Sequence, residues 1–305
     1  MSVTTVALTT AGAVAAARGF SFEWFSSLPV YRAANRAQLE AFLGDLRLPS
    51  PWQGIDVACG VGLMSELCHE IAGRVGALIQ RTICVDLDRQ ALEIAREKLA
   101  RYPAYFLQSL GQRLPVRDDV GSFVVIGNGI HNFGAQEKVD LFKEAFRVLR
   151  SGASLFFNSA FYQGAAVEGT ERFYYDNVRG ALRYILRMKP RPPELAGEKP
   201  QAVQHISPRE YVELAREAGF TDVEYHETDV RMPQELWEAI CDYYDYSQGA
   251  LHYKYPAEVA CPAMRQAVRD IFNDPEWEQK YPGMTDERGQ RFIPRRWLWV
   301  TARKP

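Results

Sequence analysis

An apolar segment that runs straight into a glycine-rich turn, GIDVACGVG at residues 54–62, restricts the fold of this chain more than any other feature. Apolar residues flank a lone aspartate, Asp56, and the segment has the length and β-branched character of a buried strand. Small residues then let the backbone turn tightly and approach another molecule. The apolar residues of LMSELCHEIAG recur at helical spacing, so we expect a strand, a turn and a helix that stops near Gly73.

The same order of strand and helix repeats until about residue 160. Further strands are expected at RTICVDLD, AYFLQS, SFVVIGNG and ASLFFNSA. Amphipathic helices are expected at DRQALEIAREKLARY, which Asp88 caps, and at KVDLFKEAFRVLRSG, with Gly152 just past its end. Strands that alternate with helices over short connections predict an α/β fold with a parallel sheet and right-handed crossovers.

Asp86, at the end of the second expected strand, indicates the kind of ligand. In such a sheet the ligand binds beyond the carboxyl ends of the strands, where a carboxylate can accept hydrogen bonds from two ribose hydroxyls. We therefore expect an adenosine-containing cofactor. The dinucleotide pattern G-x-G-x-x-G is incomplete, because Ser65 stands at the third glycine position, and Asp86 comes later than that pattern requires. An NAD-dependent oxidoreductase or epimerase is disfavoured on these grounds but stays an alternative.

Several segments together resemble the class I S-adenosylmethionine-dependent methyltransferases. IDVACGVG resembles the first motif of that family, RLPVRDDVGSF the stretch leading into strand four, and GNGIHNF the segment that lines the methyl-transfer site. AFRVLRSGASLFF and SPREYVELAREAGFTDVEYHE resemble later helices and strands, the second with a capping box at Ser207 and Glu210. The resemblance covers about residues 50–160 and extends to a final strand pair near 219–229 and 294–303. It implies a Rossmann-like, seven-stranded class I methyltransferase sheet.

The resemblance also implies which residues would bind S-adenosylmethionine or its product, S-adenosylhomocysteine. The loop after strand one would lie under the methionine part of the cofactor, and the acid after strand two would bind the ribose. Residues beside that acid and after strand three would lie near the adenine, and the end of strand four would offer a backbone carbonyl to the amino group. The predicted cofactor residues are Asp56, Ala58, Cys59, Gly60, Gly62, Asp86, Leu87, Ser109, Leu110 and Asn128. Within this set, Asp56 is expected to order the glycine loop by accepting its backbone amides.

Two positions depart from the family pattern. The family often has an aspartate for the adenine amino group where this chain has Leu110, with Ser109 beside it. Strand four of the family usually begins Phe-Asp, whereas this chain has Phe123 followed by Val124. A protein that keeps the fold and binds the cofactor without transferring methyl therefore stays a second alternative.

The candidate catalytic residues are histidines. Methyl transfer from a sulfonium is a displacement that chiefly needs alignment, and a general base helps when the acceptor is a hydroxyl. His131 lies just past strand four, and His205 could reach the pocket from the lid. The structural alternative for His131 is a neutral histidine that is hydrogen-bonded to a loop. No cluster of ligands has convincing spacing for a metal, so none is expected.

Additions around the core are where substrate specificity should lie. The expected divisions are an N-terminal tail and helical cover (1–50), the cofactor-binding core (51–160), a lid insertion (161–206), the last core helix and strand six (207–229), a helical substrate cover (230–293) and the final strand (294–305). The aromatic-rich insertions would close a pocket for an apolar small molecule, and could equally form a homodimer interface. Basic side chains such as Arg183 and Arg187 would suit an acidic group on the substrate, or form a solvated helix face.

Composition narrows the class of protein. The formal net charge of −2 gives no basic field for nucleic acid, and no uncharged apolar run is long enough to span a membrane. The five cysteines lack paired spacing, which is typical of free thiols in the cytoplasm. The sequence therefore predicts a cytoplasmic enzyme that transfers methyl from S-adenosylmethionine to a small, largely hydrophobic metabolite, with O-methylation favoured over C- or N-methylation.

Overall fold

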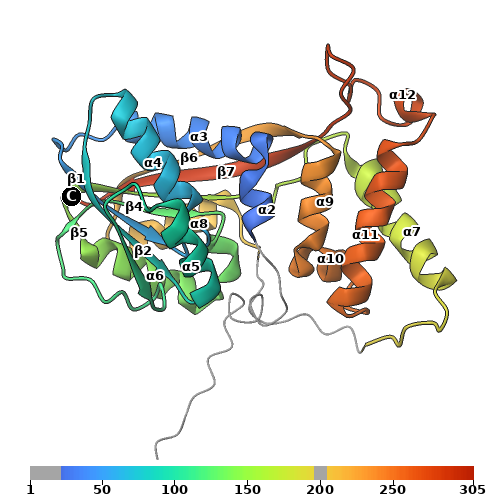
Figure 1. Ribbon diagram of the computed structural model, residues 1–305, viewed down its shortest axis with the longest axis horizontal. Coiled ribbons are helices and arrows are strands. Elements are labelled where there is room, and N and C mark those ends of the chain that lie inside the picture. The colour runs from blue at the N-terminus through green and yellow to red at the C-terminus, as the bar shows by residue number, and fades with distance from the viewer. Residues whose placement is uncertain (1–21, 196–204) are drawn as a thin grey trace, which may run out of the picture.

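A seven-stranded sheet forms the centre of the protein in the computed structural model, which describes residues 22–195 and 205–305 (Figure 1). The strand order is β3-β2-β1-β4-β5-β7-β6, and β7 alone runs antiparallel to its neighbours. The winding reverses beside β1, and a ligand crevice forms at such a point, beyond the carboxyl ends of the strands. The strands are β1 (Trp52–Val57), β2 (Ile79–Asp86), β3 (Ala104–Gln108), β4 (Gly121–Gly127), β5 (Leu149–Ser159), β6 (Thr221–Met232) and β7 (Ile293–Arg303).

Helices cover both faces of this sheet. α3 and α4 pack on one face, α6 and α8 pack on the other, and α5 lies against β2 and β3. Successive side chains of a strand point to opposite faces, so Phe123 enters the core under α3 and α4 while Val124 enters the core under α6 and α8. The bounds are α2 (Phe22–Ser27), α3 (Pro29–Gly44), α4 (Leu63–Arg74), α5 (Arg89–Lys98), α6 (Ala135–Val148) and α8 (Pro208–Glu217).

The remaining helices form a bundle beside the sheet (Figure 1). α7, from the segment after β5, packs against α11, and α11 packs against α9 and α10, from the segment between β6 and β7. Aromatic rings fill the contact, where the ring centroids of Phe173 and Trp237 are 4.5 Å apart. The bounds are α7 (Glu171–Arg187), α9 (Gln234–Asp242), α10 (Tyr244–Ala250), α11 (Ala257–Phe272) and α12 (Trp277–Lys280). Two insertions that are distant in sequence therefore share one aromatic core.

The predicted fold class is confirmed, because the sheet is seven-stranded, its helices alternate with parallel strands, and the insertions are helical and aromatic-rich. Two predicted caps are also present. The side chain of Asp88 accepts a hydrogen bond from the backbone N–H of Gln90 at 2.8 Å and so caps α5. Ser207 and Glu210 form the expected capping box at the start of α8.

Of two predicted helix ends, one is confirmed and one is wrong. α4 ends at Arg74, next to the predicted stop at Gly73, and the left-handed glycine that follows this helix is Gly76, with φ of +70°. α6 ends at Val148 rather than just before Gly152, because the chain from Leu149 onward already pairs with β4. Sheet pairing thus overrides the helical pattern of the last residues before Gly152.

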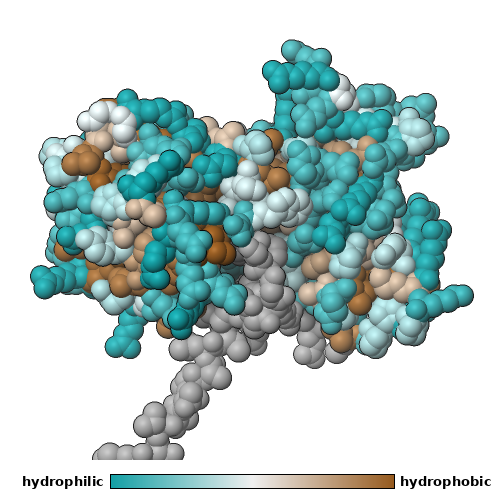
Figure 2. All heavy atoms as spheres, in the orientation of Figure 1, coloured by the Kyte–Doolittle hydropathy of each residue, from teal (hydrophilic) through white to brown (hydrophobic). Residues whose placement is uncertain are grey.

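Hydrophilic residues cover most of the face shown in Figure 2, over the sheet and over the helical bundle. Some large apolar side chains stay exposed on α7, among them Tyr175, Leu182 and Leu186. Within residues 22–195 and 205–305, none of the helices has the length and apolar character of a membrane span. The same residues contain no gathering of three or more His, Cys, Asp or Glu side chains suited to a metal ion.

Candidate active site

The turn after β1 has the left-handed backbone that its small residues allow. The φ angle is +54° at Ala58, +52° at Gly60 and +84° at Gly62. Cys59 donates its N–H to the carbonyl of Val85 at 3.1 Å, and Gly62 donates its N–H to the carbonyl of Cys59 at 2.9 Å. The first bond ties the predicted cofactor loop to the end of β2, and the second closes the turn within the loop.

Gly60 and Gly62 are needed for different reasons. A Cβ on Gly60 would meet no atom within 4 Å, so the loop borders open space there. A Cβ on Gly62 would lie 2.9 Å from Leu99 Cδ1 and 3.2 Å from Ala95 Cβ, both in or next to α5. Gly60 therefore leaves room for a ligand, whereas Gly62 lets α4 begin close to α5.

Asp86 ends β2 beside this loop. Its Oδ2 accepts a hydrogen bond from the N–H of Gly60 at 2.7 Å, and its Oδ1 accepts one from the N–H of Asp88 at 2.9 Å. Burial raises the pKa of the Asp86 carboxyl, and the backbone amides of Asp88, Gly60 and Leu87 oppose that shift because they stabilise the charged form. Each oxygen keeps a further lone pair, so the carboxylate can still accept from two neighbouring hydroxyls.

Asp56 caps α4 and does not bind the amides of the glycine loop, so that expectation is wrong. Its Oδ2 accepts hydrogen bonds from the backbone N–H of Ser65 at 3.0 Å and from the Ser65 hydroxyl at 2.6 Å. Ser65 lies in the first turn of α4, whose free N–H groups and dipole attract a carboxylate. The side chain is fully buried, which raises the pKa of Asp56 to about 7. A direct contact between Asp56 and the cofactor stays a prediction.

The residues predicted to lie near the adenine meet at the ends of β2 and β3. Gln108 Nε2 donates to the carbonyl of Leu87 at 2.9 Å, and the N–H of Ser109 donates to the carbonyl of Asp86 at 3.0 Å. Leu87, Ser109 and Leu110 are all partly exposed. The structure brings these residues together with Asp86, and their contact with adenine stays a prediction.

Asn128 follows β4 with a left-handed backbone, at φ of +48°. Its N–H donates to Asn158 Oδ1 at 2.7 Å, and its Oδ1 accepts from the N–H of Ala160 at 3.1 Å. Asn35 Oδ1, on α3, accepts from Asn128 Nδ2 at 3.2 Å and from Asn158 Nδ2 at 2.8 Å. Asn158 Nδ2 also donates to Gln38 Oε1 at 2.6 Å. This buried amide network fixes the backbone at the end of β4 against α3.

His131 is buried on a short 3-10 turn, η1 (Ile130–Asn132). Its Nδ1 lies 3.1 Å from the hydroxyl oxygen of Ser159, and its ring centroid lies 4.7 Å from that of Phe161. Burial, together with nearby positive charges, lowers the pKa of His131 well below its usual value. The ring is therefore neutral near neutral pH and is a weaker base than an exposed histidine.

A narrow, mostly apolar cavity separates the end of β4 from the helical bundle. Asn128 and His131 line it on the sheet side, Tyr31 lines it from α3, and Phe161 and Tyr243 complete the wall toward the bundle. Its volume is only ≈ 10 Å³, which is room for about one water molecule, so an acceptor could place no more than its reacting end here, beside His131. The structure therefore places one of the two candidate histidines against the end of β4.

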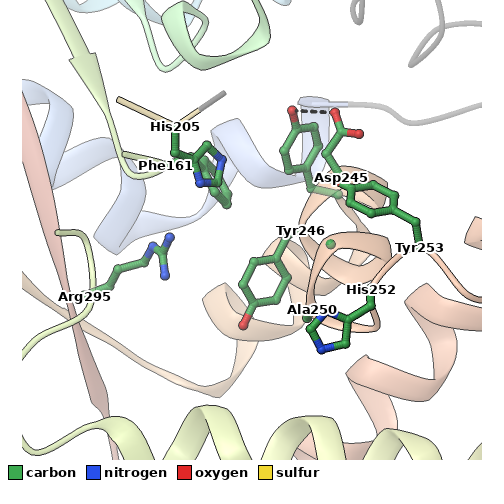
Figure 3. A pocket seen from close by; sticks show the side chains of 10 residues that line it. Phe161, His205, Asp245, Tyr246, Ala250, His252, Tyr253 and Arg295 are labelled. Atoms are coloured by element: carbon green, nitrogen blue, oxygen red, sulfur yellow. Dashed lines mark hydrogen bonds between the residues drawn. The ribbon is translucent and has the colours of Figure 1, made fainter. Parts of the chain in front are cut away.

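Phe161 and Tyr243 also line a second pocket, of ≈ 420 Å³, inside the bundle side of the molecule (Figure 3). His205 belongs to its wall and is exposed, and Arg295 and Tyr246 point into it from β7 and α10. The two cavities adjoin because they share two aromatic residues. His205 thus lines the outer pocket, whereas His131 lines the inner one.

The loop, the carboxylate and the cavity fit an adenosine cofactor with a transferable group. Gly60 leaves the open space that a nucleoside needs, and Asp86 keeps free lone pairs for ribose hydroxyls. Residues 55–157 match the sequence profile of a family described as a methyltransferase domain. This region is a class I S-adenosylmethionine-dependent methyltransferase domain. The methyltransferase therefore uses S-adenosylmethionine as its cofactor.

Solved structures similar to this methyltransferase support the fold. A proposed methyltransferase of Bacillus halodurans C-125 is 17% identical, with 88% of this chain and 99% of that chain covered at a TM-score of 0.51. The YcgJ protein of Bacillus subtilis is 13% identical, with 90% and 99% covered at a TM-score of 0.52. The phosphoethanolamine N-methyltransferase 2 of Haemonchus contortus, in complex with phosphomonomethylethanolamine and S-adenosylhomocysteine, is 13% identical, with 90% and 52% covered at 0.50. A search of curated proteins finds no match.

The sequence reasoning missed Arg295, the arginine that lines the outer pocket of this methyltransferase. Arg183 and Arg187, the basic residues expected to suit an acidic substrate, are exposed and line neither of the two cavities. A usable signal was present in IPRRWLWV, where alternation places Arg295 on the same buried face as Ile293 and Trp297. A charged residue at a core position of a strand marks a site or an ion pair.

Proposed function

We propose that this methyltransferase transfers the methyl group of S-adenosylmethionine to a small, largely hydrophobic metabolite, and that the acceptor atom is oxygen. The observation that carries the proposal is the aromatic-lined pocket of ≈ 420 Å³, whose residues Phe161 and Tyr243 also line the small cavity beside His131. A cavity lined by rings at the end of β4 suits an apolar molecule presented to the cofactor.

Residues of this chain would hold the cofactor at the strand ends. Asp86 would accept the ribose hydroxyls, and the turn through Ala58 and Gly60 would lie against the methionine part. The carbonyl of Asn128, fixed by the buried amide network, would accept a hydrogen bond from the cofactor's amino group. Bound S-adenosylmethionine supplies a methyl group that is already activated by the positive sulfur, so the protein's main task is to align the acceptor.

The preference for oxygen rests on His131. A neutral imidazole in the cavity wall can take the proton of an attacking hydroxyl, and the hydroxyl of Ser159 at 3.1 Å from Nδ1 orients the ring. Phe161 and Tyr243 pack against this ring, with centroids 4.7 and 5.8 Å away, and exclude water from the same space. His205 would act from the outer pocket, as a contact to the substrate.

The first test is calorimetric titration with S-adenosylhomocysteine, with NAD as the parallel control. Micromolar binding of S-adenosylhomocysteine without an NAD signal is expected. Transfer of labelled methyl to a panel of phenols, carboxylic acids and amines then identifies the acceptor class. Absence of S-adenosylhomocysteine binding, or binding without transfer to any member of a broad panel of apolar acceptors, would contradict the proposal. The cytoplasmic location and the homodimer stay predictions, which fractionation of cells and light scattering would test.

A further inference from the structure

Arg295 is a buried cation held in place by neutral partners. It lies on β7 and is 7% exposed. Its Nε donates to the carbonyl of Ala160 at 2.7 Å, and its Nη1 donates to the hydroxyl oxygen of Tyr174 at 3.0 Å. These two bonds fix the plane of the guanidinium relative to the end of β5.

The guanidinium keeps unused donors. An arginine has five N–H donors, and two are used by Ala160 and Tyr174, which leaves three on Nη1 and Nη2. No carboxylate among residues 22–195 and 205–305 forms an ion pair with Arg295. By contrast Arg296, the next residue on the strand, pairs with Asp229 at 2.7 Å. Buried charges in proteins are normally paired, so Arg295, which has no carboxylate partner among the described residues, is suited to bind an anion.

Aromatic rings surround the guanidinium on the pocket side. Its central carbon lies 5.1 Å from the ring centroid of Phe161, 5.9 Å from that of Trp237 and 6.0 Å from that of Tyr246. Ring faces stabilise a cation in part and exclude water from it. They also form walls against which a flat, apolar molecule can pack, and Figure 3 shows Arg295 and Tyr246 facing the same cavity.

Phe161 connects Arg295 to the candidate methyl-transfer position. Its ring centroid is 5.1 Å from the central carbon of Arg295 and 4.7 Å from the centroid of His131. A molecule that packs beside Phe161 can therefore contact Arg295 and lie near His131. In Figure 3, Asp245 lies on the far side of Tyr246 from Arg295, and its carboxylate accepts a hydrogen bond from the hydroxyl of Tyr243 at 3.1 Å. A negative group on the ligand would therefore lie at Arg295 and away from Asp245.

We propose that Arg295 binds the carboxylate of a small aromatic acid and so selects the substrate of this methyltransferase. The inference rests on the proposed function and adds the chemical class of the substrate. One carboxylate matches the single charge of one guanidinium and can accept from Nη1 and Nη2 together. A phosphate dianion would leave a surplus negative charge in a pocket that already contains Asp245. The acceptor atom is then a second group of the acid, at the far end of the ring from its carboxylate.

The experiment compares acids with their neutral carboxamides in three forms of the protein saturated with S-adenosylhomocysteine. The probes are para-hydroxybenzoate, para-hydroxyphenylpropionate and para-hydroxycinnamate, each with its amide, titrated by calorimetry. The forms are wild type, Arg295→Met, which keeps an apolar side chain of similar length, and Arg296→Met, which removes a neighbouring charge outside the pocket. Loss of a charge-assisted hydrogen-bond pair should weaken binding of at least one acid by ~10-fold or more in Arg295→Met only.

The outcomes are distinct for the two proposals. The carboxylate site is supported if wild type and Arg296→Met bind the acids and not the amides. Arg295→Met should then lose the acids while its affinity for S-adenosylhomocysteine is unchanged. Equal binding of acids and amides, an equal loss in both variants, or no binding of any acid by protein that binds S-adenosylhomocysteine overturns it. Failure of wild type to bind S-adenosylhomocysteine would instead contradict the proposed function.

Discussion

Replacing Asp86 with alanine should remove most of the cofactor affinity, and replacing its neighbour Asp88 should not. The Asp86 carboxylate lies at the end of β2 and accepts the amides of Gly60 and Asp88 at 2.7 and 2.9 Å. Alanine would remove the acceptor for both ribose hydroxyls and would also release the N–H of Gly60 from the position that it has in the loop. The side chain of Asp88 instead accepts the N–H of Gln90 at the start of α5.

The magnitude follows from the number of hydrogen bonds. A hydrogen bond to a charged group contributes ~1.5–3 kcal/mol, so the loss of two should cost ~3 kcal/mol or more, which is at least ~100-fold in the dissociation constant. Asp88→Ala removes a helix cap and should lower the free energy of unfolding by ~1 kcal/mol. The dissociation constant of Asp88→Ala for S-adenosylhomocysteine should stay within ~3-fold of wild type, because a small shift of α5 should change the binding free energy by no more than ~0.6 kcal/mol.

Two measurements on wild type and both variants separate affinity from stability. Calorimetric titration with S-adenosylhomocysteine gives the affinity, and urea unfolding gives the stability. The expected pattern is a large loss of affinity in Asp86→Ala and a loss of stability without a loss of affinity in Asp88→Ala. If Asp86→Ala bound S-adenosylhomocysteine within ~3-fold of wild type, the carboxylate would not bind the ribose. Equal losses of affinity in both variants would mean that the whole β2–α5 turn had been disturbed, and would refute the assignment to Asp86.

Three further predictions concern the loop and the buried ionisable groups. Gly60→Ala should mainly weaken S-adenosylhomocysteine binding, whereas Gly62→Ala should mainly lower the free energy of unfolding, because its Cβ would lie 2.9 Å from Leu99. If the same variant were the more damaging one in both assays, this division of roles would be contradicted. Asp56→Asn keeps the acceptor oxygen but cannot ionise. With a folded pKa of about 7, Asp56 holds its proton more tightly in the folded protein, so its contribution to stability falls as pH rises from ~4 to 7. The slope of unfolding free energy against pH should be more positive in Asp56→Asn by up to ~1.4 kcal/mol per pH unit over that range, and an unchanged slope in urea unfolding would argue against it. His131→Ala should lower kcat for a hydroxyl acceptor by ~10²-fold or more and leave kcat for a carboxylate acceptor nearly unchanged. Steady-state rates with the two acceptor types would check this, and an equal loss of kcat with both would exclude a role of His131 as a base.

The cofactor half of the site could be predicted from the sequence because its signals are local. Asp56, the small residues from Ala58 to Gly62 and the acid at Asp86 each stand next to the strand that positions them. A strand of a parallel sheet carries its own last residues to the same edge as its neighbours' last residues. The positions of these residues therefore followed once the alternation of strands and helices had been read.

Details of the same loop could not be predicted, because they depend on which of two nearby partners is closer. Asp56 bonds to Ser65 in α4 and not to the glycine amides, and Gly62 packs against Leu99, a residue far along the chain. Both choices depend on how α4 lies against β1 and α5. Nothing in the residue types alone separates a capping aspartate from a loop-ordering one.

The substrate half of the site depends on contacts between distant segments. The wall of the inner cavity combines Tyr31, Asn128 and Tyr243, which are contributed by α3, the end of β4 and the turn after α9. The amide network joins Asn35 to Asn158, and neither residue carries a sequence signal for the other. Such pairs form because burial leaves an amide no water to bond with, so each must find a partner within the packed core.

By itself the sequence determined the α/β sheet, the capped helices and the adenosine-binding turn, because periodicity and turn chemistry act over a few residues. The tertiary structure alone decided that two distant insertions form one aromatic bundle. It also decided that Arg295, on the last strand, faces their pocket without a carboxylate partner among the residues it describes. A charge on a strand has no chemical meaning until packing determines what surrounds it, because burial and neighbouring groups set both its cost and its partner.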